Sequence, residues 1–327
     1  MKVIISNFPI PDSFVENVAY TLTAMGHTVI TPKTIIGHSK HPVLNVARDL
    51  FERGFPNHWN ASERWAVAAA KQSDGADLLI WLTKSLRQEV LDEVKRLNVK
   101  CCVAWWGDAP ANMRGLGLLA PGWDGIFIKD AATVSKFQAV GLPASLLHEA
   151  CNPSWHARLF SSIGNEIAVA GTYYGYRQYL ISKLLDSGEE MALYGPRPPR
   201  WASKTIRSAH RGQYITKKKK SQIFGEALIC LNSTALSEGN SLNCRAFEIA
   251  GACGLQLIED KPVVSECFDP DSEVLTYRCV DEIREYIAKA RREPEWAMRI
   301  REAGHRRAHS EHTYEKRLRH IIESVGL

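Results

Sequence analysis

The feature that most restricts the fold is a regular alternation of short apolar runs with longer amphipathic stretches. The apolar runs have the length of strands, and the stretches between them carry apolar residues at helical spacing. Such alternation is typical of βαβ units, in which parallel strands form a sheet that is covered by helices. The runs that we expect to be strands in the first half of the chain are 3–5, 26–31, 75–83, 101–108 and 123–130.

The pattern then starts again, which indicates a second α/β domain. A polar linker over 152–165 is followed by a new series of apolar runs, at 166–171, 191–195, 227–232, 255–259 and 273–277. The chain has 327 residues, enough for two domains of about 150 residues each. We therefore expect two Rossmann-like domains, 1–155 and 156–327, with a final helix that can cross back to the first.

Composition excludes several classes of protein. An apolar fraction of 45% and nine tryptophans exclude disorder, and a net charge of +5 says little about partners. No apolar segment approaches the roughly 20 residues of a membrane-spanning helix, and the first residues do not form a signal peptide. The eight cysteines are scattered without a CxxC pair, so we expect a reducing cytoplasm and no structural zinc.

The strongest candidate for a binding site is the stretch EGNSLNCRAFEIAGACG (238–254), which follows the predicted strand 227–232. A polar loop after a strand, leading into a helix, is where an open α/β sheet binds ligands, and helix N-termini favour anions. Arg245 and Glu248 lie three residues apart and share one helix face. An arginine there suits a phosphate, and a glutamate one turn later suits a ribose diol. The alternative is a surface ion pair.

These residues resemble the GT-B glycosyltransferases of the spore-maturation CgeB-like group. NCRAFEIAGACG and the closing AGHRRAHSEHTYEKRLRHII carry the resemblance, with looser support from WWGDAP (105–110), WDGIFIKD (123–130) and LHEACNPSWH (147–156). The resemblance implies two domains facing a cleft, a nucleoside-diphosphate sugar (by expectation a UDP-sugar) as donor, and neither metal nor other cofactor. A more distant resemblance is to the phage β-glucosyltransferases that modify hydroxymethylated DNA bases.

The resemblance also implies roles for individual donor-binding residues. It places Arg245 on the diphosphate and Glu248 on the ribose hydroxyls, with Asn243 at the start of the same helix. The predicted strand-to-helix turn VAGTYYGYR (169–177) offers backbone N–H groups to phosphate, and the resemblance places Arg177 there; we include Gly171, Thr172 and Tyr173 in the site. The alternative for this second segment is an ordinary turn.

Asp108 is the candidate catalytic residue. It follows the apolar run 101–106, whose carboxyl end should open on the interdomain cleft, and it can act as general base toward an acceptor hydroxyl. The alternative is an aspartate that caps the next turn. Glu238 stands ten positions before Glu248, which is not the spacing of many retaining GT-B enzymes. This departure favours Asp108 and an inverting displacement.

A basic stretch over 191–225 contains nine Lys and Arg residues and no acid. Such a local field favours a polyanion such as DNA, although exposed lysine runs are more often simply solvated. A further stretch, 41–65, mixes aromatic and basic residues and either lines the acceptor side or packs. The predicted acceptor or polyanion residues are Arg197, Arg200, Lys204, Arg211, Lys217, Lys218, Lys219 and Lys220.

Three functions remain open at this stage. The first is a transferase whose acceptor is a hydroxymethylated DNA base, and the second is a transferase acting on a carbohydrate or small molecule. The third is a non-catalytic module that binds nucleotides or DNA, or an epimerase that shares the fold. Asp269-Pro-Asp271 resembles a metal motif, but it follows no buried strand and is interpreted as a turn. We expect no metal site.

Overall fold

The computed structural model describes residues 1–33, 43–44, 46–47, 50–51, 60–82, 86–113 and 118–327. The chain divides into two compact units. Unit 1 comprises Met1–His148 and Tyr314–Leu327, and unit 2 comprises Glu149–Thr313. The division therefore falls a few residues before the expected boundary at 155, and the last helix belongs to unit 1.

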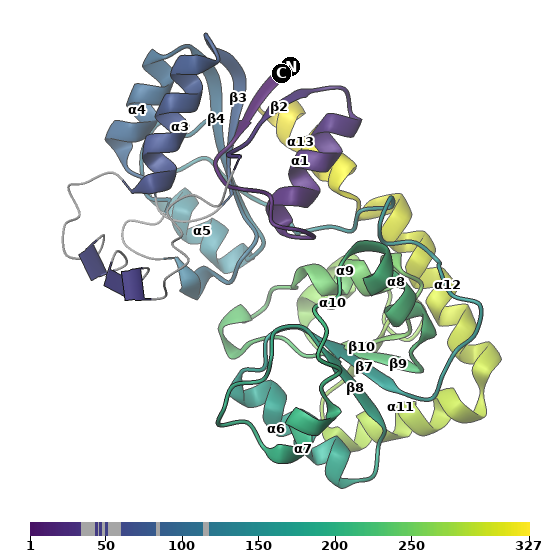
Figure 1. The fold of residues 1–327 in the computed structure, drawn as a ribbon. Helices are drawn as coiled ribbons and strands as arrows, with labels where there is room; N and C mark the ends of the chain where they lie inside the picture. Colours follow the sequence, from purple (N-terminus) through teal and green to yellow (C-terminus); the bar gives the residue numbers. More distant parts are fainter. Residues whose placement is uncertain (34–42, 45, 48–49, 52–59, 83–85, 114–117) are drawn as a thin grey trace. The chain divides into compact units, whose positions relative to one another are not determined.

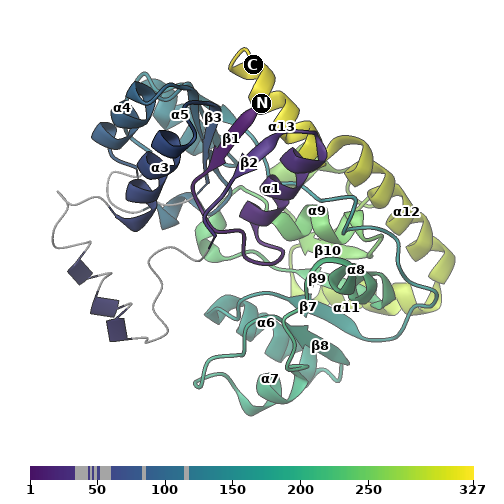
Figure 2. The ribbon, with the colours of Figure 1, turned by 45° about the horizontal axis from the view of Figure 1, so that its top comes forward.

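Unit 1 is built around a six-stranded parallel sheet with the strand order β2-β1-β3-β4-β5-β6. The last helix, α13, packs beside α1 although it is some 300 positions away in the sequence (Figures 1 and 2). The elements are β1 (Lys2–Ile5), α1 (Phe14–Ala24), β2 (Thr28–Ile30), α3 (Ala61–Gln72), β3 (Ala76–Trp81), α4 (Gln88–Arg96), β4 (Val99–Trp106), β5 (Gly125–Ile128), α5 (Ala131–Ala139), β6 (Ala144–Leu146) and α13 (Tyr314–Ser324).

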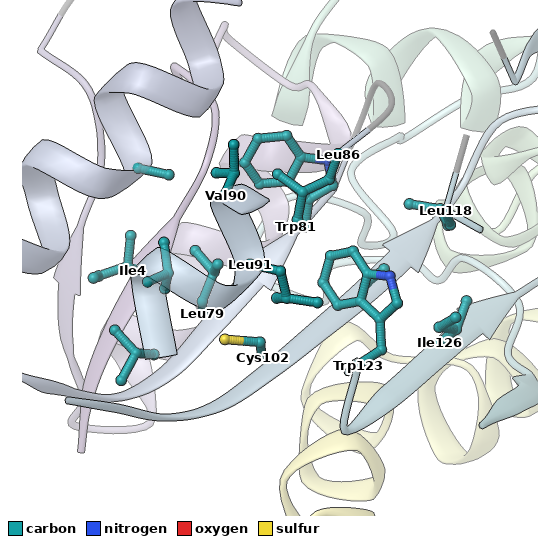
Figure 3. Close-up of a cluster of buried hydrophobic side chains, with 14 of the residues drawn as sticks. Ile4, Leu79, Trp81, Leu86, Val90, Leu91, Cys102, Leu118, Trp123 and Ile126 are labelled. Atoms are coloured by element: carbon teal, nitrogen blue, oxygen red, sulfur yellow. The ribbon is translucent and has the colours of Figure 1, made fainter. Parts of the chain in front are cut away.

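The core of unit 1 lies between this sheet and the helices α3 and α4. Trp81 and Leu79 of β3 meet Val90 and Leu91 of α4 there, next to Trp123 (Figure 3). Each large side chain is withdrawn from water, and burial of a leucine or valine stabilises the fold by about 1.5–3 kcal/mol. The C-terminal ends of these buried strands are thereby held in place.

Unit 2 is a second parallel sheet, with the strand order β11-β10-β9-β7-β8. The order reverses at β7, because β8 lies on one side of it and β9 on the other; ligands bind at such a switch point. The elements are β7 (Ile167–Ala170), α6 (Gly175–Asp186), β8 (Met191–Tyr194), α7 (Lys204–Ala209), α8 (Lys217–Glu226), β9 (Ile229–Asn232), α9 (Cys244–Gly251), β10 (Gln256–Glu259), α10 (Pro262–Cys267), β11 (Leu275–Tyr277), α11 (Val280–Arg292) and α12 (Pro294–Glu311).

Both faces of the unit 2 sheet are covered, as the apolar strands predict. Ile167 and Val169 of β7 point into a cluster with α6 and α11, whereas Ala168 and Ala170 point into a cluster with α8 and α9. Alternate residues of a strand face opposite sides, so one short run serves two helical layers.

A buried arginine of α12 fastens the ends of α8 and α9. The Arg301 side chain is 1% exposed and donates hydrogen bonds to the carbonyls of Gly225, Ala227, Leu228 and Cys253. Helix ends leave carbonyl groups without partners, and a cation there also suits the helix dipole. Arg301 therefore fixes two helices that carry candidate site residues at their other ends.

Candidate functional site

Gly171, directly after β7, lies at the centre of the candidate donor site. Its φ of +136° is strained for any residue with a Cβ. A Cβ there would lie 2.7 Å from Nη1 of Arg177 and 3.1 Å from Cζ of Arg245. Two guanidinium groups thus converge on one backbone position, and they can do so because no side chain separates them.

Arg177, near the start of α6, is held from both sides of the switch point. Its Nη1 donates to the carbonyl of Thr172 at 2.8 Å, and its Nε donates to Oγ of Ser233 at 2.9 Å. The carbonyl of Ser233 accepts from its Nη2 and from the hydroxyl of Tyr174. Burial and the neighbouring Arg245 lower the pKa of Arg177. The guanidinium is therefore fixed in position but costly to keep charged.

Arg245 is placed by the N-terminus of α9. Asn243 caps this helix by accepting from the N–H of Ala246, and it exchanges two amide hydrogen bonds with Asn232 at the end of β9. Within the described residues, the Arg245 guanidinium has neither a hydrogen-bond acceptor nor a carboxylate within 4.0 Å, and its Nε is buried. The site therefore offers two cations and a helix N-terminus, with no carboxylate of the described residues in direct contact with Arg245.

Glu248 lies one turn further along α9, but it does not pair with Arg245. Its carboxylate is buried, with Oε1 2.8 Å from Nζ of Lys220 and 3.8 Å from Nε2 of His156. Although burial acts to raise it, the charge of Lys220 brings the pKa of Glu248 well below 4.5. Oε2 has no hydrogen-bond partner among the residues that the structure describes. The surface ion pair that we considered for Arg245 and Glu248 is absent from this part of the chain.

The other predicted donor residues contribute differently. Thr172 is exposed and takes part through its backbone carbonyl, as described above. Tyr173 is buried, and its hydroxyl donates to the carbonyl of Tyr194 in β8, so its side chain braces the loop. Gly195, at the end of β8, packs directly against the backbone of Gly171.

Asp108 lies in unit 1, in the turn that follows β4. The side chain is exposed, and Oδ1 accepts hydrogen bonds from the N–H of Ala109 at 2.8 Å and from Nδ2 of Asn112 at 3.0 Å. The turn-capping role is thus observed. It occupies one carboxylate oxygen, so the side chain can still accept a proton at Oδ2.

The basic stretch is less uniform than its sequence suggests, and one assignment in it is wrong. Lys220 is buried against Glu248, because positions 220, 223, 224 and 227 share the face of α8 that points to the core; it is not part of an exposed surface. Arg211 pairs with Glu166, and Lys217 lies over the ring of Trp155. The other exposed members of the predicted set are Arg197, Arg200, Lys204, Lys218 and Lys219, and Arg211 is exposed beside its partner.

Two exposed aromatic rings accompany these cations. Trp201 is 70% exposed and Tyr214 is 67% exposed, and both lie in the loops between β8 and α8. Most of the predicted stretch 41–65 lies outside the described residues.

Sequence reasoning missed Ser233 and the pairing role of Lys220. Ser233 follows β9 directly, and a polar residue at the carboxyl end of a buried parallel strand is a signal that could have identified it. For Lys220 the signal was the helical spacing of Ile223, Phe224 and Ala227, which places position 220 on the apolar face.

Comparison with known proteins shows what the chain resembles. The family model described as glycosyl transferase-like matches residues 176–323. No curated protein matches the chain. No helix among the described residues has the length and apolar character required to cross a bilayer.

Solved glycosyltransferase structures share the fold over almost the full length of the chain. A sucrose-phosphate synthase from Thermosynechococcus elongatus is 12% identical, with a TM-score of 0.68 over 98% of this chain and 97% of that one. HepE from Anabaena in complex with UDP-glucose is 8% identical, with a TM-score of 0.68 over 99% and 98%. An alpha-glucosyltransferase in complex with UDP and a 13-mer DNA containing a HMU base is 14% identical, with a TM-score of 0.64 over 100% of both chains.

These comparisons confirm the predicted α/β architecture of the GT-B type and the predicted kinship with glycosyltransferases. The solved neighbour that holds DNA is an alpha-glucosyltransferase, whereas the sequence resemblance was to beta-glucosyltransferases. Residues 176–323 match the family model described as glycosyl transferase-like, and the chain as a whole shares the GT-B fold of the solved glycosyltransferases.

Proposed function

We propose that the protein transfers a sugar from a nucleoside-diphosphate sugar, with UDP as the nucleotide, to a hydroxyl acceptor. In this proposal unit 2 binds the donor and unit 1 binds the acceptor. The observation that carries it is the convergence of Arg177 and Arg245 on Gly171, without a carboxylate partner in the described part of the chain. Two withdrawn like charges without a carboxylate partner repel each other, and an anion that binds between them relieves this repulsion.

A diphosphate fits this site better than a single carboxylate does. Two guanidinium groups offer several N–H donors in fixed planes, and the N-terminus of α9 adds backbone N–H groups. When the sugar leaves, negative charge develops on the diphosphate, and fixed cations stabilise that charge without reorganisation. The same two arginines supply the charge that a divalent metal supplies in other transferases, so we propose that the reaction needs no metal and no further cofactor.

The remaining roles are assigned to Glu248 and Asp108. Oε2 of Glu248 accepts hydrogen bonds from the ribose hydroxyls, and Asp108 takes the proton of the acceptor hydroxyl through Oδ2. Direct attack by the acceptor would then invert the configuration at the anomeric carbon. All eight cysteines are free thiols, which fits the reducing cytoplasm that we propose as the setting.

Calorimetry with UDP tests the donor site. We expect Arg245→Gln to weaken UDP binding roughly 10- to 100-fold, the equivalent of one or more charge-assisted hydrogen bonds. Arg278→Gln is the matched control, because Arg278 is exposed and pairs with Glu282 in the same unit. Equal UDP affinity of the two variants would refute the site. If UDP binds but no donor sugar is ever transferred, the protein is instead a nucleotide-binding module.

For the acceptor, we propose a hydroxymethylated base in DNA as the first candidate. The exposed cations Arg197, Arg200 and Lys204, with the exposed ring of Trp201, form a surface suited to a nucleic-acid backbone. The fold neighbour that holds DNA gives further support. A carbohydrate or small-molecule acceptor is the alternative, and an enzyme of that kind needs no such surface.

The salt dependence of DNA binding distinguishes the two acceptors. If Arg197 and Arg200 contact phosphates, replacing both with glutamine should reduce the slope of log affinity against log salt by about 2. Arg278→Gln with Arg284→Gln removes the same charge from exposed positions outside the basic stretch and is the control. The DNA acceptor is excluded if duplex DNA carrying hydroxymethylated bases fails to bind the unaltered protein at low salt.

A further inference from the structure

We infer that Lys220 is a positioning residue for the donor: it holds one oxygen of the Glu248 carboxylate so that the other is presented to the ribose. The inference rests on the proposed function, because it concerns the same donor site. It replaces the polyanion contact that the sequence predicted for this lysine.

The two helices that carry the pair are packed rigidly against each other. Lys220 lies in the first turn of α8 and Glu248 in α9, and the two helices are neighbours in unit 2 (Figure 1). Ile223 and Phe224 of α8 pack with Ile249 of α9 in one buried cluster. These apolar contacts hold in place the two helices between which Nζ of Lys220 and Oε1 of Glu248 lie 2.8 Å apart.

A second group lies near the same oxygen. Nδ1 of His156 accepts the N–H of Asn152 at 2.9 Å, so the neutral ring carries its proton on Nε2. That nitrogen lies 3.8 Å from Oε1 of Glu248. Full burial lowers the pKa of His156 to about 3, which keeps the ring neutral. The cation and the imidazole N–H both face Oε1.

Oε2 is consequently the oxygen left for a ligand. It is buried and has no hydrogen-bond partner in the described part of the chain. A buried acceptor without a partner is unfavourable, and a hydroxyl group of the ligand satisfies it. A carboxylate held in this way distinguishes ribose from its deoxy forms, since the discrimination requires both the negative charge and a fixed direction.

The distribution of charge explains why a lysine is needed there. A buried carboxylate without a cation takes up a proton or turns toward another donor. Besides Lys220 on α8, the nearby cation is Arg245, which lies on α9 together with Glu248. A Glu248 side chain released from Lys220 can therefore turn toward Arg245 and occupy the diphosphate site. Lys220 therefore keeps the acidic and basic halves of the donor site apart.

The test compares the affinities of UDP and 2′,3′-dideoxy-UDP by calorimetry, using the full chain. The unaltered protein should prefer UDP by on the order of 10- to 100-fold, the value of a hydrogen bond to a charged group. Lys220→Met should lose this preference almost completely, as should Glu248→Gln. Lys219→Met, one position away on the exposed face of α8, should retain it. A Lys220→Met protein with the unaltered preference would overturn the inference.

The outcomes separate this inference from the proposed function. If the unaltered protein does not bind UDP, the proposed function itself fails. If UDP binds and Lys220→Met does not fold, Lys220→Gln takes its place, because the shorter amide keeps a polar group beside the buried carboxylate but supplies no charge to hold it. A Lys220→Gln variant that folds and keeps the preference, or one that also fails to fold, assigns Lys220 to fold stability alone and contradicts the positioning role.

Discussion

Replacing Gly171 with alanine should separate the donor site from the fold. The added Cβ would lie 2.7 Å from Nη1 of Arg177, and this nitrogen cannot move away freely because Thr172 and Ser233 hold the guanidinium. The φ of +136° adds about 1–3 kcal/mol of backbone strain. A displaced guanidinium loses a charge-assisted bond to phosphate worth about 1.5–3 kcal/mol, so UDP affinity should fall roughly 10- to 100-fold.

Urea unfolding and calorimetry with UDP measure the two effects separately. Gly175→Ala is the matched control, because Gly175 begins α6 only four positions later and an added Cβ there meets no atom within 4 Å. We expect the control to bind UDP normally and to be as stable as the unaltered protein, or slightly more so. A folded Gly171→Ala protein that binds UDP with unaltered affinity would refute the convergence of Arg177 and Arg245 as the phosphate site.

Three further predictions concern catalysis and stability. Asp108→Asn should retain UDP binding and lose turnover at least 100-fold, measured as UDP release, whereas Asn112→Ala should retain most activity; full activity of Asp108→Asn removes it as the base. Arg301→Met should lower the free energy of unfolding by about 3 kcal/mol or more, because buried carbonyls lose their donors, and an unchanged urea midpoint would show that other groups satisfy them. Burial lowers the pKa of His148 to about 4 and that of His156 to about 3, so the unfolded chain binds more protons than the folded protein below pH 6.5. As the pH falls below 6.5, the free energy of unfolding should therefore decrease by about 1.4 kcal/mol per pH unit for each histidine. A urea midpoint that is equal at pH 7 and pH 5 contradicts this.

The fold could be predicted from the sequence because its signals are local. The strand at Ile229–Asn232 lies within the apolar run 227–232, and the strand at Ile167–Ala170 lies within the run 166–171. Buried parallel strands must be apolar on both faces, so they are visible without knowledge of their neighbours. The return of the final helix to unit 1 depends on contacts distant in sequence, so local patterns permit it but do not predict it.

The candidate site was predicted less completely, for a physical reason. Arg177 and Arg245 both lie at ends of elements that flank β7, and the topology alone brings such ends together. The pairing of Glu248 was not predictable, since the choice between Arg245 and Lys220 is decided by how α8 packs on α9. Lys220 is buried whereas Lys218 and Lys219 of the same run are exposed, and composition alone cannot distinguish them.

Mass spectrometry of transfer products tests the central claim most directly. A panel of nucleotide sugars is incubated with the protein and with two acceptors, hydroxymethylated DNA and a set of glycans, and Arg245→Gln serves as the matched control. We predict that one acceptor gains a sugar residue from a UDP-sugar, and that the gain is strongly reduced with Arg245→Gln. Absence of transfer from every donor to every acceptor, or equal transfer by the two proteins, would contradict the account.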